Sequence, residues 1–240
     1  VDLLEWKTPA PIGRPHPEAN ALGFMRLCLT HHDLDALHAE LTKAGVSTRS
    51  GPVSVPVIEG HDVRFFCCAD PDGTCIEFVE RPGPVRMSHI NINCSDLDAS
   101  SAWYQRVLGV VPIAPRAEPP PASGAGFGFD GECRYRADFL AVDGNPESLI
   151  LDLLEWQDPK PVGTPHAEAN HLGLFRMAFM VDDAKASCAE LDRLGVEHSG
   201  PCFLEMGPEV PIDGGLHAVF FRDPDGTCLE LIQTPKLKGA

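Results

Sequence analysis

Four charged side chains interrupt short apolar runs whose alternating pattern is typical of β-strands. Because side chains two residues apart in a strand share a face, each charged residue points away from its apolar neighbours. One imidazole and two carboxylates on such a face can hold an octahedral divalent ion with open water positions. That ion would polarise a carbonyl or enolate of a bound molecule. The four residues are His89 in MSHININ, Asp152 in ILDLLEW, Arg176 in FRMAFMV and Glu230 in TCLELIQ.

Arg176 leaves two interpretations of this set open. A guanidinium keeps its protons and cannot be a metal ligand. Opposite Glu230 it could form a bidentate ion pair in the place of a metal, or it could bind a carboxylate of the substrate beside one. In one interpretation His89, Asp152 and Glu230 bind iron, manganese, nickel, zinc or magnesium. In the other, a metal-free cup is held by an Arg176–Glu230 pair.

Other side chains could complete the same site. His217 could act with Glu230 as a catalytic base, although a packed histidine is the competing interpretation. Asn91 and Trp156 could contact the substrate together with Arg176. A core role competes for Trp156, because large aromatic side chains are mostly buried.

The chain is a tandem duplication. Residues 1–46 align without gaps on residues 151–196, and 23 of these 46 positions are identical. A second match joins residues 69–80 to residues 222–233, each with a D-P-D-G turn. A fixed repeat of this length indicates repeated structural modules.

The register of the repeat predicts an incomplete first copy. The segment between Arg86 and Ile150 has no upstream counterpart. We therefore expect residues 1–82 to be the C-terminal part of a first domain, namely the last strand of module one plus module two. Residues 83–240 would be a complete second domain. The chain would then be a fragment, or a protein that lost its first module.

Each module combines strands and a helix in the same order. Strands alternate polar and apolar residues, and the helices end at glycines. The pattern predicts an α+β fold of repeated βαβββ modules. They would form curved, barrel-like mixed sheets with helices on the convex face. A Pro/Gly-rich stretch at 112–128 predicts a loop or mobile lid. The expected helices span 32–45, 95–109 and 182–195, and the expected strands include 24–30, 62–68, 74–80, 87–94, 133–144, 148–156, 174–181, 215–221 and 227–233.

Two motifs and the βαβββ order resemble a known family. The motifs are D-A-x-x-A-W-Y-x-x-V-L-G in the helix at 98–109 and D-P-D-G-x-x-x-E-L at 223–231. Together they resemble the vicinal oxygen chelate superfamily, which includes glyoxalase I, bleomycin-resistance proteins and extradiol dioxygenases. The resemblance is specific for the fold and weak for the reaction, since one scaffold hosts many chemistries.

The resemblance implies that two modules close into one cup around a divalent metal. The ligands would come from the first and last strands of each module. They would be His89, Asp152 where the family usually has Glu, Arg176 where it usually has His or Gln, and Glu230. The surviving positions of the first copy would be Asp2, Arg26 and Glu77, without the histidine-bearing strand.

We accordingly expect modules three and four to form one cup over residues 87–233, and no activity from the first copy. The expected function is metal-assisted chemistry of the lyase, isomerase or ring-cleaving dioxygenase type on a small oxygenated molecule. Dioxygenase chemistry ranks low, because Arg176 stands where a second histidine is needed. The alternative is a non-catalytic small-molecule binder of the bleomycin-resistance type.

The net charge indicates which classes of binding partner to expect, and the cysteines indicate the cellular compartment. The 240-residue chain has a net charge of −16, which repels phosphate backbones and anionic lipid. We therefore expect a small-molecule ligand, no nucleic acid and no membrane, with homodimer formation left open. The nine cysteines form no C-x-x-C motif and favour a reducing cytoplasm.

Overall fold

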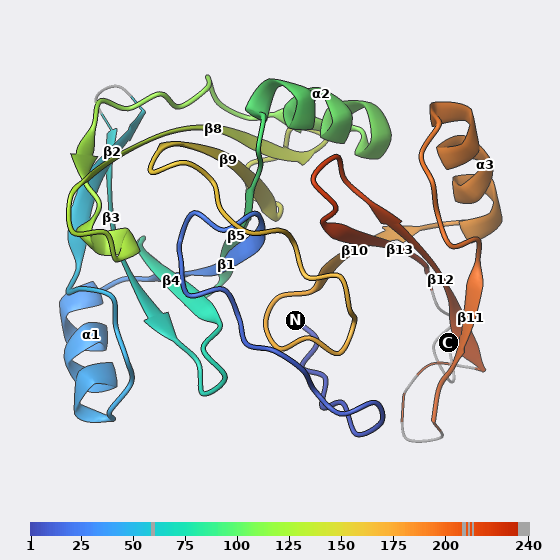
Figure 1. Cartoon of the computed structure of the whole chain (residues 1–240), viewed down its shortest axis with the longest axis horizontal. Coiled ribbons are helices and arrows are strands. Elements are labelled where there is room, and N and C mark those ends of the chain that lie inside the picture. The colour runs from blue at the N-terminus through green and yellow to red at the C-terminus, as the bar shows by residue number, and fades with distance from the viewer. Residues whose placement is uncertain (59–60, 208–209, 211, 213, 235–240) are drawn as a thin grey trace. The chain divides into compact units, whose positions relative to one another are not determined.

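The computed structural model describes residues 1–58, 61–207, 210, 212 and 214–234. It divides into two compact units, Val1–Phe175 and Arg176–Ala240. Each unit has its own mixed sheet with helical cover, two α-helices in unit 1 and one in the described part of unit 2, so the expected α+β class with curved sheets is confirmed (Figure 1). Within the described residues, no helix is long and apolar enough to cross a membrane.

Unit 1 is built on a nine-stranded sheet. Its strands are β1 (Gly23–His31), β2 (Val53–Ile58), β3 (His61–Ala69), β4 (Cys75–Glu80), β5 (Met87–Asn93), β6 (Val110–Pro112), β7 (Ala122–Ser123), β8 (Glu132–Val142) and β9 (Ile150–Asp158). Their order is β2-β3-β4-β1-β5-β9-β8-β6, with β7 paired to β8. β1 lies parallel to β4 and antiparallel to β5, and β5 lies parallel to β9.

The central pair of this sheet, β1 and β5, joins module two to module three. The expectation that modules three and four share a cup is therefore wrong. β5 has β1 on one side and β9 on the other, so neither edge is free for a strand of module four. The structural division after Phe175 also differs from the expected boundary near residue 83, which stays a proposal about the duplication.

The sheet of unit 1 curves until its two ends approach each other. β7, at one end, contacts β2 at the other, and the short 3₁₀ helix η1 (Ala125–Phe127) contacts β3. A side chain at Gly126 would come within 2.6 Å of both Phe65 and Val53. The stretch expected as a loop or lid therefore holds a short strand and a 3₁₀ turn packed into the cup.

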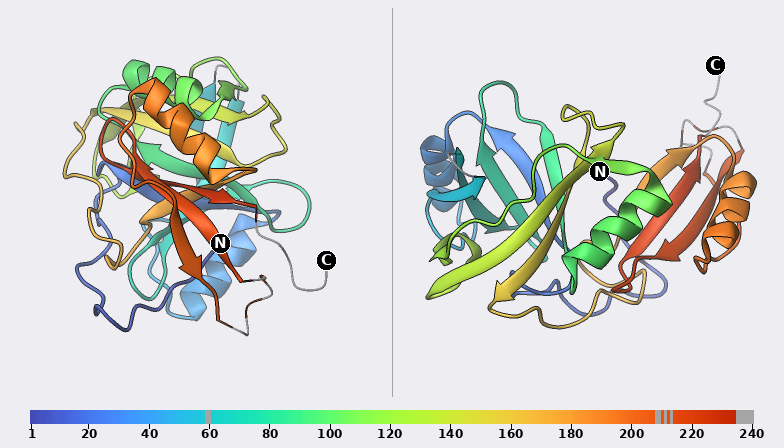
Figure 2. Two further views of the ribbon diagram at one scale, coloured as in Figure 1. Left: turned by 90° about the vertical axis from the view of Figure 1, so that its right-hand side faces the viewer. Right: turned by 90° about the horizontal axis from the view of Figure 1, so that it is seen from above.

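Two helices cover the outside of unit 1: α1 (Leu34–Lys43) and α2 (Leu97–Leu108). Asp33 and Asp96 cap their N-termini by accepting backbone N–H bonds, which satisfies donors that a helix start leaves unpaired. The view from above shows α2 lying along β8 and β9 (Figure 2).

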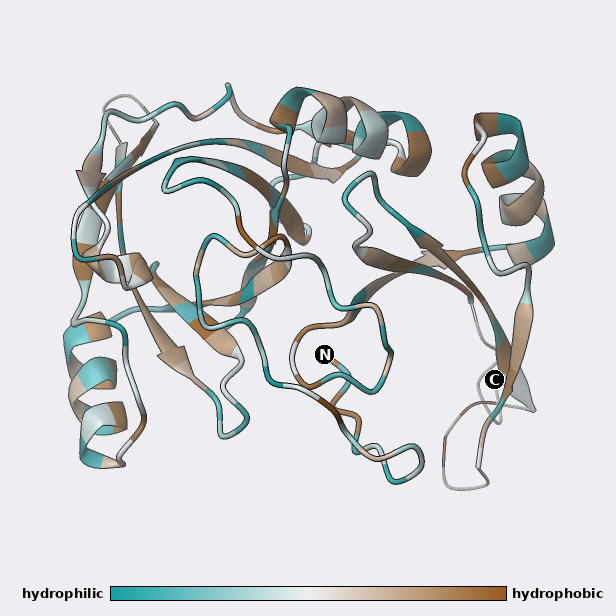
Figure 3. Cartoon of the chain, viewed as in Figure 1, coloured by the Kyte–Doolittle hydropathy of each residue, from teal (hydrophilic) through white to brown (hydrophobic). Residues whose placement is uncertain are grey.

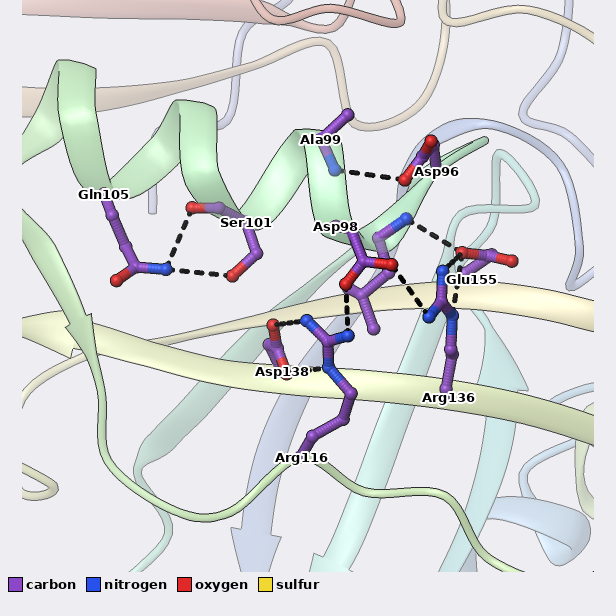
Figure 4. Close-up of polar contacts among 10 residues, drawn as sticks. Asp96, Asp98, Ala99, Ser101, Gln105, Arg116, Arg136, Asp138 and Glu155 are labelled. Carbon is purple, nitrogen blue, oxygen red and sulfur yellow. Dashed lines mark hydrogen bonds and ion pairs between the residues drawn. The ribbon is translucent and has the colours of Figure 1, made fainter.

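Ion pairs fasten α2 to the convex face of the sheet. Asp98 lies between Arg116 and Arg136, which also bind Asp138 and Glu155 (Figure 4). Because Glu155 belongs to this network, it faces the helix and not the cup.

Unit 2 is a smaller version of one module. It contains β10 (Arg176–Val181), α3 (Ala184–Leu194), β11 (Cys202–Glu205), β12 (Gly215–Arg222) and β13 (Cys228–Gln233). The sheet order is β10-β13-β12-β11, so β10 corresponds to β1 of unit 1 but is an edge strand. The sequence patterns did not predict β2, β6, β7 and β11. Of these, β2, β6 and β11 are edge strands, and β2 contains Pro56, which weakens a strand signal.

The two copies of the repeated linker bind each other within unit 1. The Asn20 side-chain amide donates to the Lys160 carbonyl and the Asn170 amide donates to the Ala10 carbonyl, both over 2.6 Å. Backbone hydrogen bonds are likewise exchanged between the two linkers, from Val162 N–H to the Asn20 carbonyl and from Ile12 N–H to the Asn170 carbonyl. Residues 1–6, expected as a strand, form none and are mostly exposed.

The strands of unit 1 are largely apolar in the hydropathy colouring (Figure 3), and their buried residues form two clusters. Leu34 of α1 packs with Phe66 and Cys68 of β3 on the convex face. The opposite, concave face carries the larger cluster, in which Phe65, Phe127, Tyr135, Leu154 and Trp156 are buried. The cup is therefore largely a packed core, with polar residues at a few positions.

Candidate metal and ligand site

One row of the unit 1 sheet places three potential ligands side by side. Cys28 on β1 is in register with Glu77 on β4 and with His89 on β5. Directly paired residues on neighbouring strands point to the same face, here the concave one. A carboxylate oxygen, the Cys28 thiol and an imidazole nitrogen all lie within 4.8 Å of one another.

The adjacent row on the same face carries the remaining charged groups. Arg26 is in register with Asn91, and Asn91 with Asp152. The Asn91 amide donates to Asp152 Oδ2 over 3.1 Å and to the Asp152 carbonyl over 3.2 Å. The two rows lie two residues apart along their strands, which is the spacing at which side chains of a β-strand return to the same face.

Arg26 connects the two rows through buried ion pairs. Its Nε donates to Glu77 Oε2 over 2.6 Å, and its Nη2 lies 3.6 Å from Asp152 Oδ2. His89 Nε2 lies 3.7 Å from Glu77 Oε1 and 4.0 Å from Asp152 Oδ2. Four ionisable groups thus share one small buried volume.

Burial and charge act against each other in this cluster. Burial alone would lower the pKa of Arg26, but Glu77 and Asp152 outweigh it and raise that pKa. Burial raises the pKa of Asp152, and the neighbouring His89 and Arg26 offset only part of the shift. The pKa of the Cys28 thiol is raised well above its ordinary value by burial and then by Glu77.

Three buried polar atoms of the site have no hydrogen-bond partner among the described residues: Arg26 Nη1, Asn91 Oδ1 and Asp152 Oδ1. Leaving such atoms unpaired costs about 1–3 kcal/mol each, more when the group is charged. They include both a donor and acceptors. A ligand or ion that engages them would recover this cost.

The Phe127 ring packs against the polar groups of the site and forms an aromatic wall there. The Arg26 guanidinium carbon lies 5.2 Å from the centre of the Phe127 ring. Phe127 itself packs edge-on against Trp156. The Arg49 guanidinium holds the turn in place by donating to the Phe127 carbonyl over 2.5 Å.

The structure brings together some of the expected site residues and separates others. His89, Asn91 and Asp152 converge as expected, but their carboxylate partner is Glu77 and not Glu230. The reason is that β5 pairs with β1 instead of β10. Trp156 is fully buried and donates to Asn93 Oδ1 over 3.2 Å, so it belongs to the core and not to an open substrate surface.

Unit 2 holds the other expected residues. Arg176 Nε donates to Glu230 Oε2 over 2.5 Å, which is the ion pair expected for a metal-free arrangement. Glu230 pairs in register with Phe220. His217 is three residues from Phe220 and so lies on the opposite face, where its ring contacts Phe203. His217 is therefore not placed to act with Glu230 as a base.

The first copy contributes three residues to this cluster. Arg26 and Glu77 were expected as surviving positions of an incomplete site, whereas Cys28 was not among the expected site residues. The signal that pointed to them is the repeat itself, because Arg26 and Glu77 align with Arg176 and Glu230. The repeat does not indicate whether β1 or β10 pairs with β5.

Comparisons with known proteins show the family and the fold. A family model described as the Glyoxalase/Bleomycin resistance protein/Dioxygenase superfamily matches residues 86–231. A probable lactoylglutathione lyase of Vibrio cholerae is 27% identical over 150 residues, covering 62% of this chain and 90% of the relative. A second, from Vibrio parahaemolyticus, is 26% identical over 151 residues, with the same coverage.

A solved structure shares the fold at low sequence identity. Glyoxalase I from Zea mays superposes with a TM-score of 0.59 at 17% identity, covering 89% of this chain and 68% of that one. At this identity the likeness shows the fold alone.

Proposed function

Because the chain belongs to the Glyoxalase/Bleomycin resistance protein/Dioxygenase superfamily, we propose that the unit 1 cup acts on a small oxygenated molecule with the help of a divalent metal. The proposed chemistry is of the lyase or isomerase type. The observation that carries the proposal is the convergence of Glu77, His89 and Asp152 on one buried face, with polar atoms left unpaired there.

The residues present fit a divalent metal. Glu77 Oε1 and His89 Nε2 face each other at 3.7 Å, a separation that small side-chain movements can close around one ion. Asp152 Oδ1 is buried and unpaired, and of the two Glu77 oxygens it is Oε2 that accepts the hydrogen bond from Arg26. Glu77, His89 and Asp152 would hold the metal, which would supply polarisation of a substrate carbonyl when bound.

The other groups of the site would bind and orient the substrate. Arg26 Nη1 would donate to an anionic or carbonyl oxygen, since it is buried and has no other partner. Burial raises the pKa of Asp152, so a cation bound beside this carboxylate would stabilise its charged form. Asn91 would hold that carboxylate in place through its 3.1 Å hydrogen bond.

The lactoylglutathione lyase relatives provide the first substrate to assay. We expect the purified protein to contain a divalent metal and to form or consume lactoylglutathione. Glu77→Gln should lower kcat/KM by on the order of 100-fold or more, because it removes a charged group from the reacting centre. Glu230→Gln is the matched comparison, since Glu230 occupies the same position in the other copy.

The comparison of these two variants locates the site. Loss of activity in Glu230→Gln with full activity in Glu77→Gln would contradict a site in unit 1. Each variant should first be shown by circular dichroism to be folded, because both carboxylates are buried.

A non-catalytic binding protein is the second candidate, and one observation favours it. The Arg26–Glu77 pair and the Phe127 wall fill much of the cup, as in the metal-free arrangement considered from the sequence. A protein that binds lactoylglutathione in calorimetry, contains no metal and produces no turnover would support this candidate over the enzyme.

A further inference from the structure

The metal proposed for unit 1 has a potential ligand besides the imidazole and the carboxylates. We propose that Cys28 binds this metal as a thiolate, which makes the centre thiophilic and suited to zinc. This inference rests on the proposed function only in requiring a divalent metal at the site. It concerns a residue outside the set that the sequence predicted for the site.

The position of Cys28 in the sheet is the first argument. β1 lies between β4 and β5, and Cys28 is the residue of β1 in register with both Glu77 and His89. An ion held between the carboxylate and the imidazole would therefore lie above Cys28. The ligand atoms of the three residues lie within 4.8 Å of one another.

The second argument is that position 26, the neighbouring position on the same face of β1, holds a residue that cannot be a metal ligand. Arg26, two residues before Cys28 on the same face, cannot coordinate a metal. Cys28 is the adjacent group on that face that can. In unit 2 the corresponding residue is Ala178, so the thiol is a feature of one copy and not of the repeat.

The surroundings of Cys28 differ from those of a cysteine that serves as a small apolar filler. Its thiol is completely buried, yet a carboxylate and an imidazole flank it, and it makes only a weak 3.8 Å contact with the Leu29 carbonyl. The site independently contains an unpaired, buried carboxylate oxygen, Asp152 Oδ1. Both features indicate that a metal ion binds between these residues.

When the metal binds, it replaces the proton on the Cys28 sulfur. The S–H bond of Cys28 breaks, a sulfur–metal bond forms, and the proton leaves to solvent. A divalent ion thereby offsets the charges of the thiolate and Glu77. Metal coordination deprotonates a thiol outright, which overcomes the effect of burial. Sulfur, nitrogen and oxygen ligands in one site favour zinc over magnesium or manganese.

Cobalt(II) substitution tests the proposal directly, because a thiolate ligand gives an intense near-ultraviolet charge-transfer band. We expect the full chain loaded with Co²⁺ to show this band. Cys28→Ala, which installs the residue of the other copy, and Cys28→Ser should both lose it. Their zinc affinity should fall by at least on the order of 10-fold.

Cys67→Ala is the control, because Cys67 faces the same cup beside Glu77 but does not belong to the three-ligand group. It should keep the band. Stoichiometric Co²⁺ without the band, or a band that survives in Cys28→Ala, would overturn the thiolate assignment alone. A parent protein that binds neither Co²⁺ nor zinc would overturn the proposed metal function as well.

Discussion

Arg26 is the residue whose charge lies between both carboxylates of the candidate site. It is almost completely buried and lies between two buried carboxylates, so its charge compensates theirs. Removing one partner of a buried pair costs more than the pair itself contributes, because the other charge is left without compensation. The same position in unit 2, Arg176, is more exposed and has one carboxylate partner.

We expect Arg26→Met to lower the free energy of unfolding of the metal-free protein by about 3–5 kcal/mol, since Glu77 loses its counter-charge. Urea denaturation would measure this change. Adding zinc should restore part of the stability, because the ion supplies positive charge in the same place.

Arg64→Met is the matched control for Arg26→Met. Arg64 pairs with Asp35 and Glu80 near the surface, where solvent screens such pairs and they contribute little to stability. Equal losses in the two variants would show that the charge of Arg26 has no special role.

The paired linkers are the element in which the duplication has a direct structural effect. His16 and His166, which are repeat counterparts, stack with ring centres 4.4 Å apart, and His171 stacks on His166 at 3.7 Å. Burial, and then the adjacent His16 and His171, lower the pKa of His166 to about 4. The folded linkers therefore hold His166 neutral at mildly acidic pH.

This stack predicts that stability falls as the pH decreases from about 6.5 to about 4. In that range a histidine of the unfolded chain takes up a proton that folded His166 does not, so protonation favours unfolding. Urea denaturation at several pH values would measure the slope. His166→Gln should flatten it.

The contribution of His166 can be separated from that of other histidines. His32→Gln, at an exposed position outside the linkers, serves as the control and should leave the slope unchanged. An identical slope in the parent and in His166→Gln would exclude the stack as its origin.

At the scale of the whole molecule, the two sheets differ in how they are covered. The unit 1 sheet has helices on one face and a large apolar cluster on the other. In unit 2, α3 packs on β12 and β13, whereas Met180 on β10 is 58% exposed. A sheet with less buried apolar surface has less free energy opposing local opening.

We therefore expect backbone amides of β12 and β13 to exchange with solvent faster than those of β1 and β5. Hydrogen exchange followed by mass spectrometry would compare the two sets within one sample, so β1 and β5 provide the internal reference. Equal protection of both sets would show that the units open together.

The sequence by itself determined the local structure of this protein and the family to which it belongs. Strand alternation, helix ends at glycines and the repeat fixed most elements, because these signals act between residues close in the chain. Parity also placed His89, Asn91 and Asp152 on one face. Of the strands that the sequence did not predict, β2, β6 and β11 lie at sheet edges, where the pattern is weaker, and β7 is only two residues long.

Only the tertiary structure decided which copy completes the site. β1 and β10 carry the same arginine at the same position, so their local patterns do not show which of them pairs with β5. The choice depends on contacts between residues far apart in sequence. Pairing with β1 puts Glu77 and Cys28 beside His89, and it leaves Glu230 with Arg176 in the other unit. A single strand pairing thus determines which residues make up the candidate metal site.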